Sequence, residues 1–145
     1  MAFMTLFDGY CVYFDGYCVY IGRKIMEIKY DVSITAIGNL ARTFLENNKS
    51  AILLDEGIRP NLSDMVIEHT PSKLEEDIKK GDKLLMGGVK YTVEKVGDAV
   101  NDNIREEGHC TIIFNATGSM PGQIIVKGPS QPTLSVGAHI TFTKK

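Results

Sequence analysis

Three histidines, with the polar residues around them, are the groups of this 145-residue chain best suited to chemistry. His69 follows a short apolar run and precedes a Thr-Pro pair, which predicts that it stands where a strand ends and the chain turns. His109 closes a polar stretch, residues 102–108, that contains an amide, a guanidinium and carboxylates. His139 alternates with apolar neighbours near the C-terminus, as on a strand, and we interpret it as structural.

The residues alone leave two roles open for His69: a surface or capping histidine, or a nucleophile. An imidazole titrates near neutral pH, so much of it has an unprotonated nitrogen that can attack an electrophile. We expect the ring to reach solvent where the strand ends. The other nitrogen should donate its proton to a fixed acceptor, for which Glu68, Glu56 and a backbone carbonyl are candidates. Glu68, adjacent on an extended segment, points to the opposite face.

Composition excludes several classes of function. The net charge is −2, and lysines and arginines are scattered, so the basic stripe of a nucleic-acid-binding protein is missing. The longest apolar runs are too short to insert directly into a membrane. Cys110 is the single cysteine beyond residue 25, which rules out a disulfide within that part and fits the cytoplasm. We expect Cys110 to be a small buried side chain in a strand rather than a catalytic thiol.

The elements that must position these groups are mostly strands. Residues 28–35 alternate polar and apolar side chains, which predicts a half-buried strand, and Gly87-Gly88 between two such runs predicts a hairpin. Short helices are expected at 38–48 and, as a single turn, at 74–80. About seven short strands with one or two short helices predict an all-β barrel or sandwich in one domain. The further strands are expected at 51–54, 65–69, 83–86, 89–96, 109–114, 123–126 and 138–143.

A perfect seven-residue repeat occupies the N-terminal region: residues 7–13 are followed at once by an identical copy, residues 14–20. The repeat is too short to be a solenoid or propeller unit. Acidic residues within it are untypical of a signal peptide. We interpret residues 1–25 as a leader that is vector-derived or precedes a mis-assigned start, with Met26 as the natural first residue. The alternative is an extra pair of strands, because tyrosine, valine and phenylalanine favour sheets.

Several short motifs occur in an order that resembles the glucitol/sorbitol-specific enzyme IIA component of the bacterial phosphotransferase system. In that family the phosphorylated histidine lies twelve residues after a Glu-Gly pair, as His69 does here. The resemblance runs from about residue 26 to the C-terminus and implies a single IIA domain, residues 26–145, folded as a closed β-barrel. The motifs that carry it are Glu56-Gly57, His69, residues 102–111, Pro121-Gly122 and Gly128-Pro129.

The resemblance also implies roles for individual residues. His69 would be the phospho-acceptor, and His109, which stands in the matching motif, would donate a hydrogen bond to the phosphoryl oxygens. Asn103 and Arg105 are further candidate donors; alternatively, they organise the loop through turns and side-chain bonds. Gly108 would let the backbone bend tightly into the following strand.

The function implied is that of a phosphocarrier. The histidine phosphocarrier protein would donate the phosphoryl group to His69, and a cysteine of the IIB component would accept it. Glucitol (sorbitol) or a related hexitol would be bound by the membrane components IIB and IIC rather than by this chain. The family uses neither a metal nor a nucleotide cofactor, and its place is the cytoplasm. Apolar residues such as Met65 and Met120 are expected at a modest, transient docking face.

Two other hypotheses remain open from the sequence. A barrel of the same fold can be a non-catalytic regulatory or binding protein in which His69 is a sensor, because fold does not fix function. A metal site of His69, His109 and Cys110 is the weaker hypothesis, because no Cys-x-x-Cys or His-x-x-x-His pair is present. Alternation along a strand would also turn Cys110 away from His109.

Overall fold

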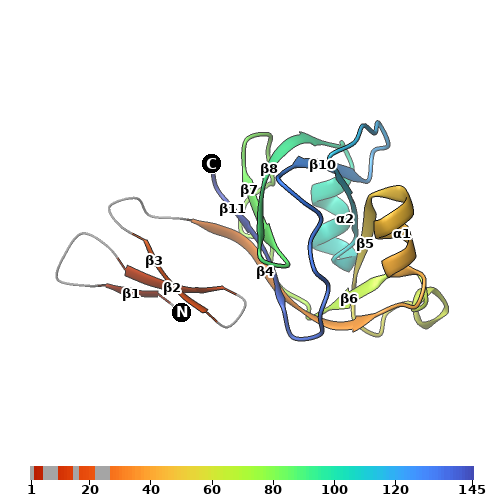
Figure 1. Ribbon diagram of the computed structural model, residues 1–145, viewed down its shortest axis with the longest axis horizontal. Helices are drawn as coiled ribbons and strands as arrows, with labels where there is room; N and C mark the ends of the chain where they lie inside the picture. The colour runs from red at the N-terminus through yellow and green to blue at the C-terminus, as the bar shows by residue number, and fades with distance from the viewer. Residues whose placement is uncertain (1, 5–9, 15–16, 22–26) are drawn as a thin grey trace.

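Eight strands close into a barrel in the computed structural model, which describes residues 2–4, 10–14, 17–21 and 27–145. Around the barrel the strand order is β10-β8-β7-β11-β4-β6-β5-β9 (Figure 1). The all-β prediction and the closed barrel are confirmed, with eight barrel strands rather than seven. The strands are β4 (Ile28–Ile37), β5 (Ser50–Asp55), β6 (Ile67–His69), β7 (Lys83–Met86), β8 (Val89–Val96), β9 (Cys110–Phe114), β10 (Gln123–Lys127) and β11 (His139–Thr143).

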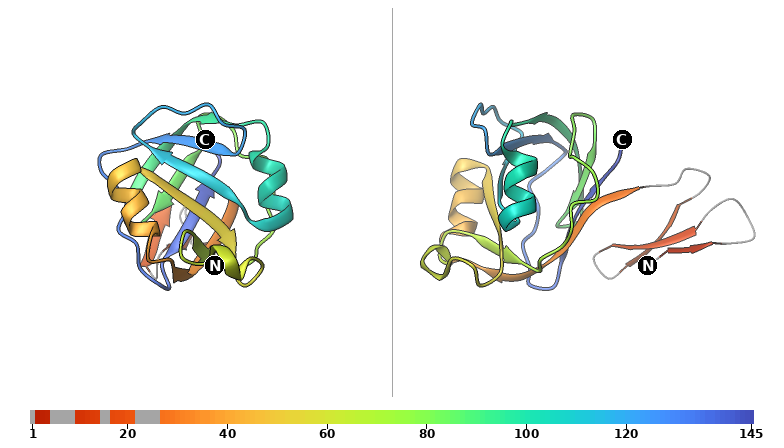
Figure 2. Two further views of the ribbon diagram at one scale, coloured as in Figure 1. Left: turned by 90° about the vertical axis from the view of Figure 1, so that its right-hand side faces the viewer. Right: turned by 180° about the vertical axis from the view of Figure 1, so that it is seen from behind.

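Two short helices lie outside the barrel, on opposite sides of it in the left view of Figure 2. The first, α1 (Ala41–Asn48), confirms the predicted helix, and a 3-10 turn, η1 (Pro60–Leu62), follows β5. The second, α2 (Val100–Glu107), was not predicted: the sequence interpretation treated this polar stretch as a loop. Val100 and Ile104, one helical turn apart, are its buried residues, so its apolar face is only two side chains wide.

The barrel interior is filled by the inward-facing side chains of every strand. On β4 these are Tyr30, Val32 and Ile34, each at most 2% exposed, so the predicted alternation is confirmed from residue 30 to residue 34. The outward side chains between them are more exposed, as a sheet with one solvated face requires. At the start of the strand the predicted alternation is wrong, because Ile28 is exposed and Lys29 is buried in its ion pair with Asp82. The hairpin between β7 and β8 also forms as predicted, with Gly87 and Gly88 at φ values of 57° and 78°.

Two of the barrel pairings are parallel, and one of them decides which residues meet. Strand β5 pairs in parallel with β6, so that Asp55 is opposite His69. Strand β5 also pairs antiparallel with β9, with Leu53 opposite Cys110. Continued by two residues, this register sets Asp55 beside Gly108. The ends of β5 and β6 therefore lie side by side with the turn that leads into β9.

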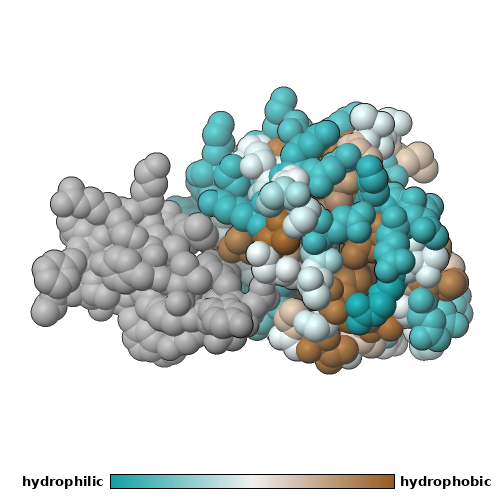
Figure 3. All heavy atoms as spheres, viewed as in Figure 1, coloured by the Kyte–Doolittle hydropathy of each residue, from teal (hydrophilic) through white to brown (hydrophobic). Residues whose placement is uncertain are grey.

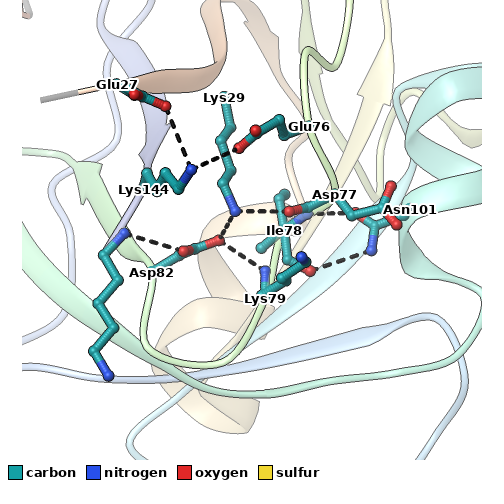
Figure 4. Close-up of polar contacts among 10 residues, drawn as sticks. Glu27, Lys29, Glu76, Asp77, Ile78, Lys79, Asp82, Asn101 and Lys144 are labelled. Atoms are coloured by element: carbon teal, nitrogen blue, oxygen red, sulfur yellow. Dashed lines mark hydrogen bonds and ion pairs between the residues drawn. The ribbon is translucent and has the colours of Figure 1, made fainter.

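The segment between β6 and β7 has no helix, contrary to the predicted turn at 74–80. Tertiary contacts replace helical hydrogen bonds there (Figure 4). Lys29, buried under the segment, donates to the Asp77 carbonyl and pairs with Asp82, both at 2.7 Å. The Asn101 side chain of α2 bonds both backbone groups of Ile78, at 2.8 and 3.2 Å. The segment is thus fixed to β4 and α2 at once.

The N-terminal residues that the structure describes form a sheet of their own, in the order β1-β2-β3. Its strands are β1 (Ala2–Met4), β2 (Tyr10–Phe14) and β3 (Tyr17–Ile21), all antiparallel. The repeat therefore does contain a strand pair, as the alternative interpretation held, but this pair does not join the barrel. That residues 1–25 are a leader stays a prediction, and Met26 lies outside the described residues. Among the described residues, no helix has the length and apolar character needed to span a membrane.

Candidate functional site

His69 ends β6 with its side chain inside the barrel, and it is 0% exposed. The expectation that its ring reaches solvent at the rim is therefore wrong. The ladder continues past the predicted end of the strand, because Thr70 donates its backbone N–H to the Ser33 carbonyl at 2.9 Å. Pro71 turns the chain only after that bond, so His69 stays between its neighbours on β4 and β5.

Both ring nitrogens of His69 face backbone carbonyl oxygens. Nδ1 is 2.8 Å from the Thr70 oxygen, and Nε2 is 2.9 Å from the Gly108 oxygen. A neutral imidazole has a single N–H, so it can donate to one of these carbonyls but not to both. Of the three candidates named from the sequence for orienting the ring, the backbone carbonyl is the one found.

Asp55 is the carboxylate beside this ring. Its Oδ1 lies 3.6 Å from Nδ1 of His69, is buried, and has no hydrogen-bond partner among the described residues. Burial raises the pKa of the Asp55 carboxyl from its ordinary 3.8, His69 lowers it, and Glu107 and Glu56 raise it further. A buried oxygen without a hydrogen-bond donor lowers the stability of the folded protein. Asp55 at this position is therefore not explained by stability.

Tyr30 and Cys110 complete the surroundings of His69 inside the barrel. The Tyr30 ring meets the His69 ring edge-on, with centroids 6.2 Å apart, and its buried hydroxyl has no partner among the described residues. Burial, then Asp55 and Cys110, raise the pKa of the Tyr30 phenol. Burial raises the pKa of the Cys110 thiol to about 12, so Cys110 is the neutral buried side chain that was expected. Both groups are uncharged near neutral pH.

Gly108 is required by the close packing at this point. It ends α2 in the left-handed conformation, with φ at 62°, and its carbonyl meets Nε2 of His69. A Cβ on Gly108 would overlap Oδ1 of Asp55 and would lie 2.7 Å from Cε1 of His69. The predicted tight bend into the next strand is therefore present, and it brings the main chain directly onto the histidine.

His109 follows this glycine but does not meet His69 ring to ring. Cys110, the next residue, is buried in the core, so alternation directs the His109 side chain to the outer face. Within the described part of the chain, no hydrogen bond or ion pair joins the His109 ring to His69. The two histidines are linked through the Gly108 carbonyl, that is, through the main chain.

Arg105 and Asn103, the candidate donors named from the sequence, lie on α2 and have contacts with neighbouring segments. Arg105 pairs with Asp77 at 2.6 Å, and both side chains are about half exposed. The carbonyl of Asn103 accepts the N–H of His109 at 3.3 Å. Arg105 thus ties α2 to the segment before β7, and the main chain of Asn103 closes the end of the helix. That either side chain donates to a phosphoryl group stays a prediction.

Glu56 and Gly57 act on His69 through the main chain. The N–H of Glu56 donates to the His69 carbonyl at 2.8 Å, and Gly57 has a φ of 74°. The N–H of Gly57 donates to the Glu68 carboxylate at 3.1 Å, so Glu68 fixes this turn instead of orienting the imidazole. The Glu-Gly pair therefore belongs to the site because it holds the end of β6.

Sequence reasoning missed Asp55 and Tyr30. Asp55 follows two leucines in a buried strand, and an acidic residue at the end of such a strand was the available signal. Tyr30 sits on the apolar face of β4 like any core residue, and nothing in the sequence marks it. Among the described residues, no group of three or more His, Cys, Asp or Glu side chains is arranged to hold a metal.

The surface of the barrel domain mixes charged and apolar groups. Arg59 of the β5–β6 connection pairs with Glu107 at the end of α2. Met65 and Met120, expected at a docking face, are 36% and 62% exposed. Figure 3 shows apolar side chains among polar ones over one face of the barrel.

Comparisons with known proteins give relatives and a structural neighbour. A family model described as "PTS system glucitol/sorbitol-specific IIA component" matches residues 29–141. The chain is 29% identical over 119 residues to the glucitol/sorbitol-specific EIIA components of Shigella flexneri and Escherichia coli K12. Each alignment covers 81% of this chain and 96% of the relative. The crystal structure of a PTS system IIA component from Enterococcus faecalis V583 has the same fold, with a TM-score of 0.73 and 24% identity. That match covers 79% of this chain and 100% of the other.

Proposed function

Because the chain belongs to the family of glucitol/sorbitol-specific IIA components of the phosphotransferase system, we propose that it is a phosphocarrier with His69 as the phosphorylated residue. The histidine phosphocarrier protein is the donor, and a cysteine of the IIB component is the acceptor. The sugar is glucitol or a similar hexitol, bound by the membrane components IIB and IIC. The protein works in the cytoplasm, where these partners meet.

The observation that carries the proposal is the setting of His69. It is the histidine twelve residues after Glu56-Gly57, and it alone of the three is wholly buried, with both ring nitrogens at main-chain carbonyls. His139 differs: it lies on the outer face, bonded to Asp31 at 3.0 Å and to Ser33 at 3.3 Å across two strands. That cross-strand arrangement is typical of a structural residue.

The chemistry requires few groups. A ring nitrogen of His69 attacks the phosphorus of the donor's phosphohistidine, a new N–P bond forms, and the electron pair of the old N–P bond returns to the donor's ring. In the second transfer a thiolate of IIB attacks the same phosphorus, and the electron pair returns to His69. Such transfers depend on positioning and on neutralising the phosphoryl oxygens. The His109 side chain lies on the outer face here, but His109 follows the Gly108 carbonyl that touches the reactive ring. We propose that it donates to those oxygens once the Gly108–His109 turn has moved.

The test is the intact mass of the protein after incubation with phosphoenolpyruvate, enzyme I and the histidine phosphocarrier protein. We expect one acid-labile phosphoryl group on the wild type and on His139→Ala, and none on His69→Gln. Thermal unfolding of each variant shows whether it is folded. A folded wild type that stays unmodified while a control IIA protein is phosphorylated would overturn the proposal and would favour the regulatory barrel.

A further inference from the structure

We propose that Asp55 is a positioning residue for His69: it keeps the ring proton on Nδ1 and leaves Nε2 as the atom that accepts the phosphoryl group. This inference rests on the proposed function. Asp55 and His69 are adjacent across the parallel β5–β6 pair, with Oδ1 of Asp55 3.6 Å from Nδ1. The strand pairing therefore places the Asp55 carboxylate beside Nδ1 of His69.

The two neutral tautomers of His69 differ sharply in this setting. With the proton on Nδ1, the N–H donates to the Thr70 carbonyl at 2.8 Å and points toward the Asp55 carboxylate. With the proton on Nε2, it donates to the Gly108 carbonyl, and the lone pair on Nδ1 faces both the Thr70 oxygen and the Asp55 oxygen. In the first arrangement the lone pair on Nε2 faces one electron-rich atom, the Gly108 oxygen, whereas in the second the lone pair on Nδ1 faces two, one of them on a charged carboxylate. The carboxylate therefore favours the proton on Nδ1.

The remaining groups near the ring do not compete with Asp55 for this role. The Tyr30 phenol and the Cys110 thiol are neutral, because burial raises the pKa of each. Glu107 is paired with Arg59, and Glu68 accepts the N–H of Gly57. Glu56, which also faces Asp55, is on the exposed turn.

The carboxylate also matches the charge that develops during transfer. When the Nε2 lone pair forms a bond to phosphorus and the proton remains on Nδ1, the ring becomes positively charged. Asp55, with the opposite charge and its Oδ1 buried beside the ring, offsets that charge. The effect is reversed in the onward step, when the N–P bond breaks and the electron pair returns to Nε2.

One consequence concerns Gly108. Its carbonyl oxygen, 2.9 Å from Nε2, occupies the place where the phosphoryl group must bind. Phosphorylation at Nε2 therefore requires the Gly108–His109 turn to move away from the ring. The same movement would carry His109, the proposed donor to the phosphoryl oxygens, with it.

The experiment combines ring ¹⁵N NMR of His69 with the rate of phosphoryl acceptance, for wild type, Asp55→Asn and Asp31→Asn. Asp31→Asn is the matched control, because Asp31 is the carboxylate of the other aspartate–histidine pair, 3.0 Å from His139. We expect Asp55→Asn to lower the rate by about 10–100-fold, as loss of a histidine's orienting partner does. Asp31→Asn should stay within about twofold, a change too small for loss of an orienting partner.

The NMR readout separates positioning from a merely structural role. The wild type should carry its ring proton on Nδ1 and, once phosphorylated, its phosphoryl group on Nε2, while Asp55→Asn should show a mixed tautomer in a folded protein. A phosphoryl group on Nδ1, or an unchanged tautomer and rate in Asp55→Asn, would overturn the inference. If even the wild type accepts no phosphate, the proposed function fails. The tautomer comparison still decides whether Asp55 places the proton.

Discussion

Nε2 of His69 lies 2.9 Å from the carbonyl oxygen of Gly108, a residue 39 positions later in the chain. This contact joins the end of β6 to the turn between α2 and β9. It also closes the ring off from solvent. The proposed phosphoryl transfer requires two partner proteins to reach this ring, so we expect partner binding to open this contact.

Replacing Gly108 by alanine should destabilise the protein more than the same change at Gly88. Both glycines have positive φ, 62° and 78°, which costs alanine about 1–2 kcal/mol at either position. At Gly108 the new Cβ also overlaps Asp55, whereas at Gly88 it meets no atom within 4 Å. We expect a further loss of about 1–3 kcal/mol at Gly108 from this crowding. Urea unfolding of both variants measures the difference, and equal losses would argue against the tight contact at the site.

Removing the His109 imidazole should slow phosphorylation without abolishing it. A hydrogen bond to a charged group contributes about 1.5–3 kcal/mol, so His109→Ala should accept phosphate at least about tenfold more slowly. His139→Ala, on the outer face, should react at the wild-type rate. Single-turnover transfer from the phosphorylated donor is the suitable assay. A His109→Ala rate equal to that of His139→Ala would leave His109 without the proposed role.

The pH dependence of stability should show that the ionised Asp55 carboxylate destabilises the folded protein. Because burial raises its pKa from 3.8 in the folded state, its contribution to stability is full below about pH 4 and is lost as the pH rises through the folded pKa. Asparagine carries no such charge. Asp55→Asn should therefore melt at or above the wild-type temperature near pH 7, and the gap should close toward about pH 4. Melting curves across this range test the sign; a gap that widens toward acid pH would contradict it.

Breaking the buried Lys29–Asp82 pair should be far more damaging than breaking a surface pair. Both side chains are 3% exposed, and the pair holds the 74–82 segment against β4. Lys29→Met leaves the buried Asp82 carboxylate without an opposite charge, although the backbone N–H groups of Lys79 and Lys145 still donate to it. A loss of about 3–5 kcal/mol is expected.

Lys144 gives the matched control for that experiment. It bridges Glu27 and Glu76 at the surface, at 3.6 and 3.7 Å, with side chains about half exposed. Lys144→Met should cost less than about 1 kcal/mol. Losses of similar size in the two variants, measured by urea unfolding, would mean that the Lys29 network contributes little.

The sequence by itself determined the class of fold, and its resemblance to a known family singled out His69 as the candidate histidine. Alternation on β4 and the paired glycines of the β7–β8 hairpin are local signals, because strand period and turn geometry depend on neighbouring residues. The spacing of Glu56-Gly57 and His69 pointed to this histidine only through the resemblance to the family. The short helix α2 was not predicted from the sequence, because its buried face consists of only two residues, Val100 and Ile104.

Only the tertiary structure decided what surrounds His69. The parallel β5–β6 pairing and the antiparallel β5–β9 pairing bring Asp55 and Gly108 to the ring, and neither register follows from residue types alone. The same pairings bury His69, which the sequence placed at a solvent-exposed rim, and separate it from the side chain of His109. In a closed barrel the pairing of each strand depends on how all eight strands fit together. It therefore cannot be read from any single segment of the sequence.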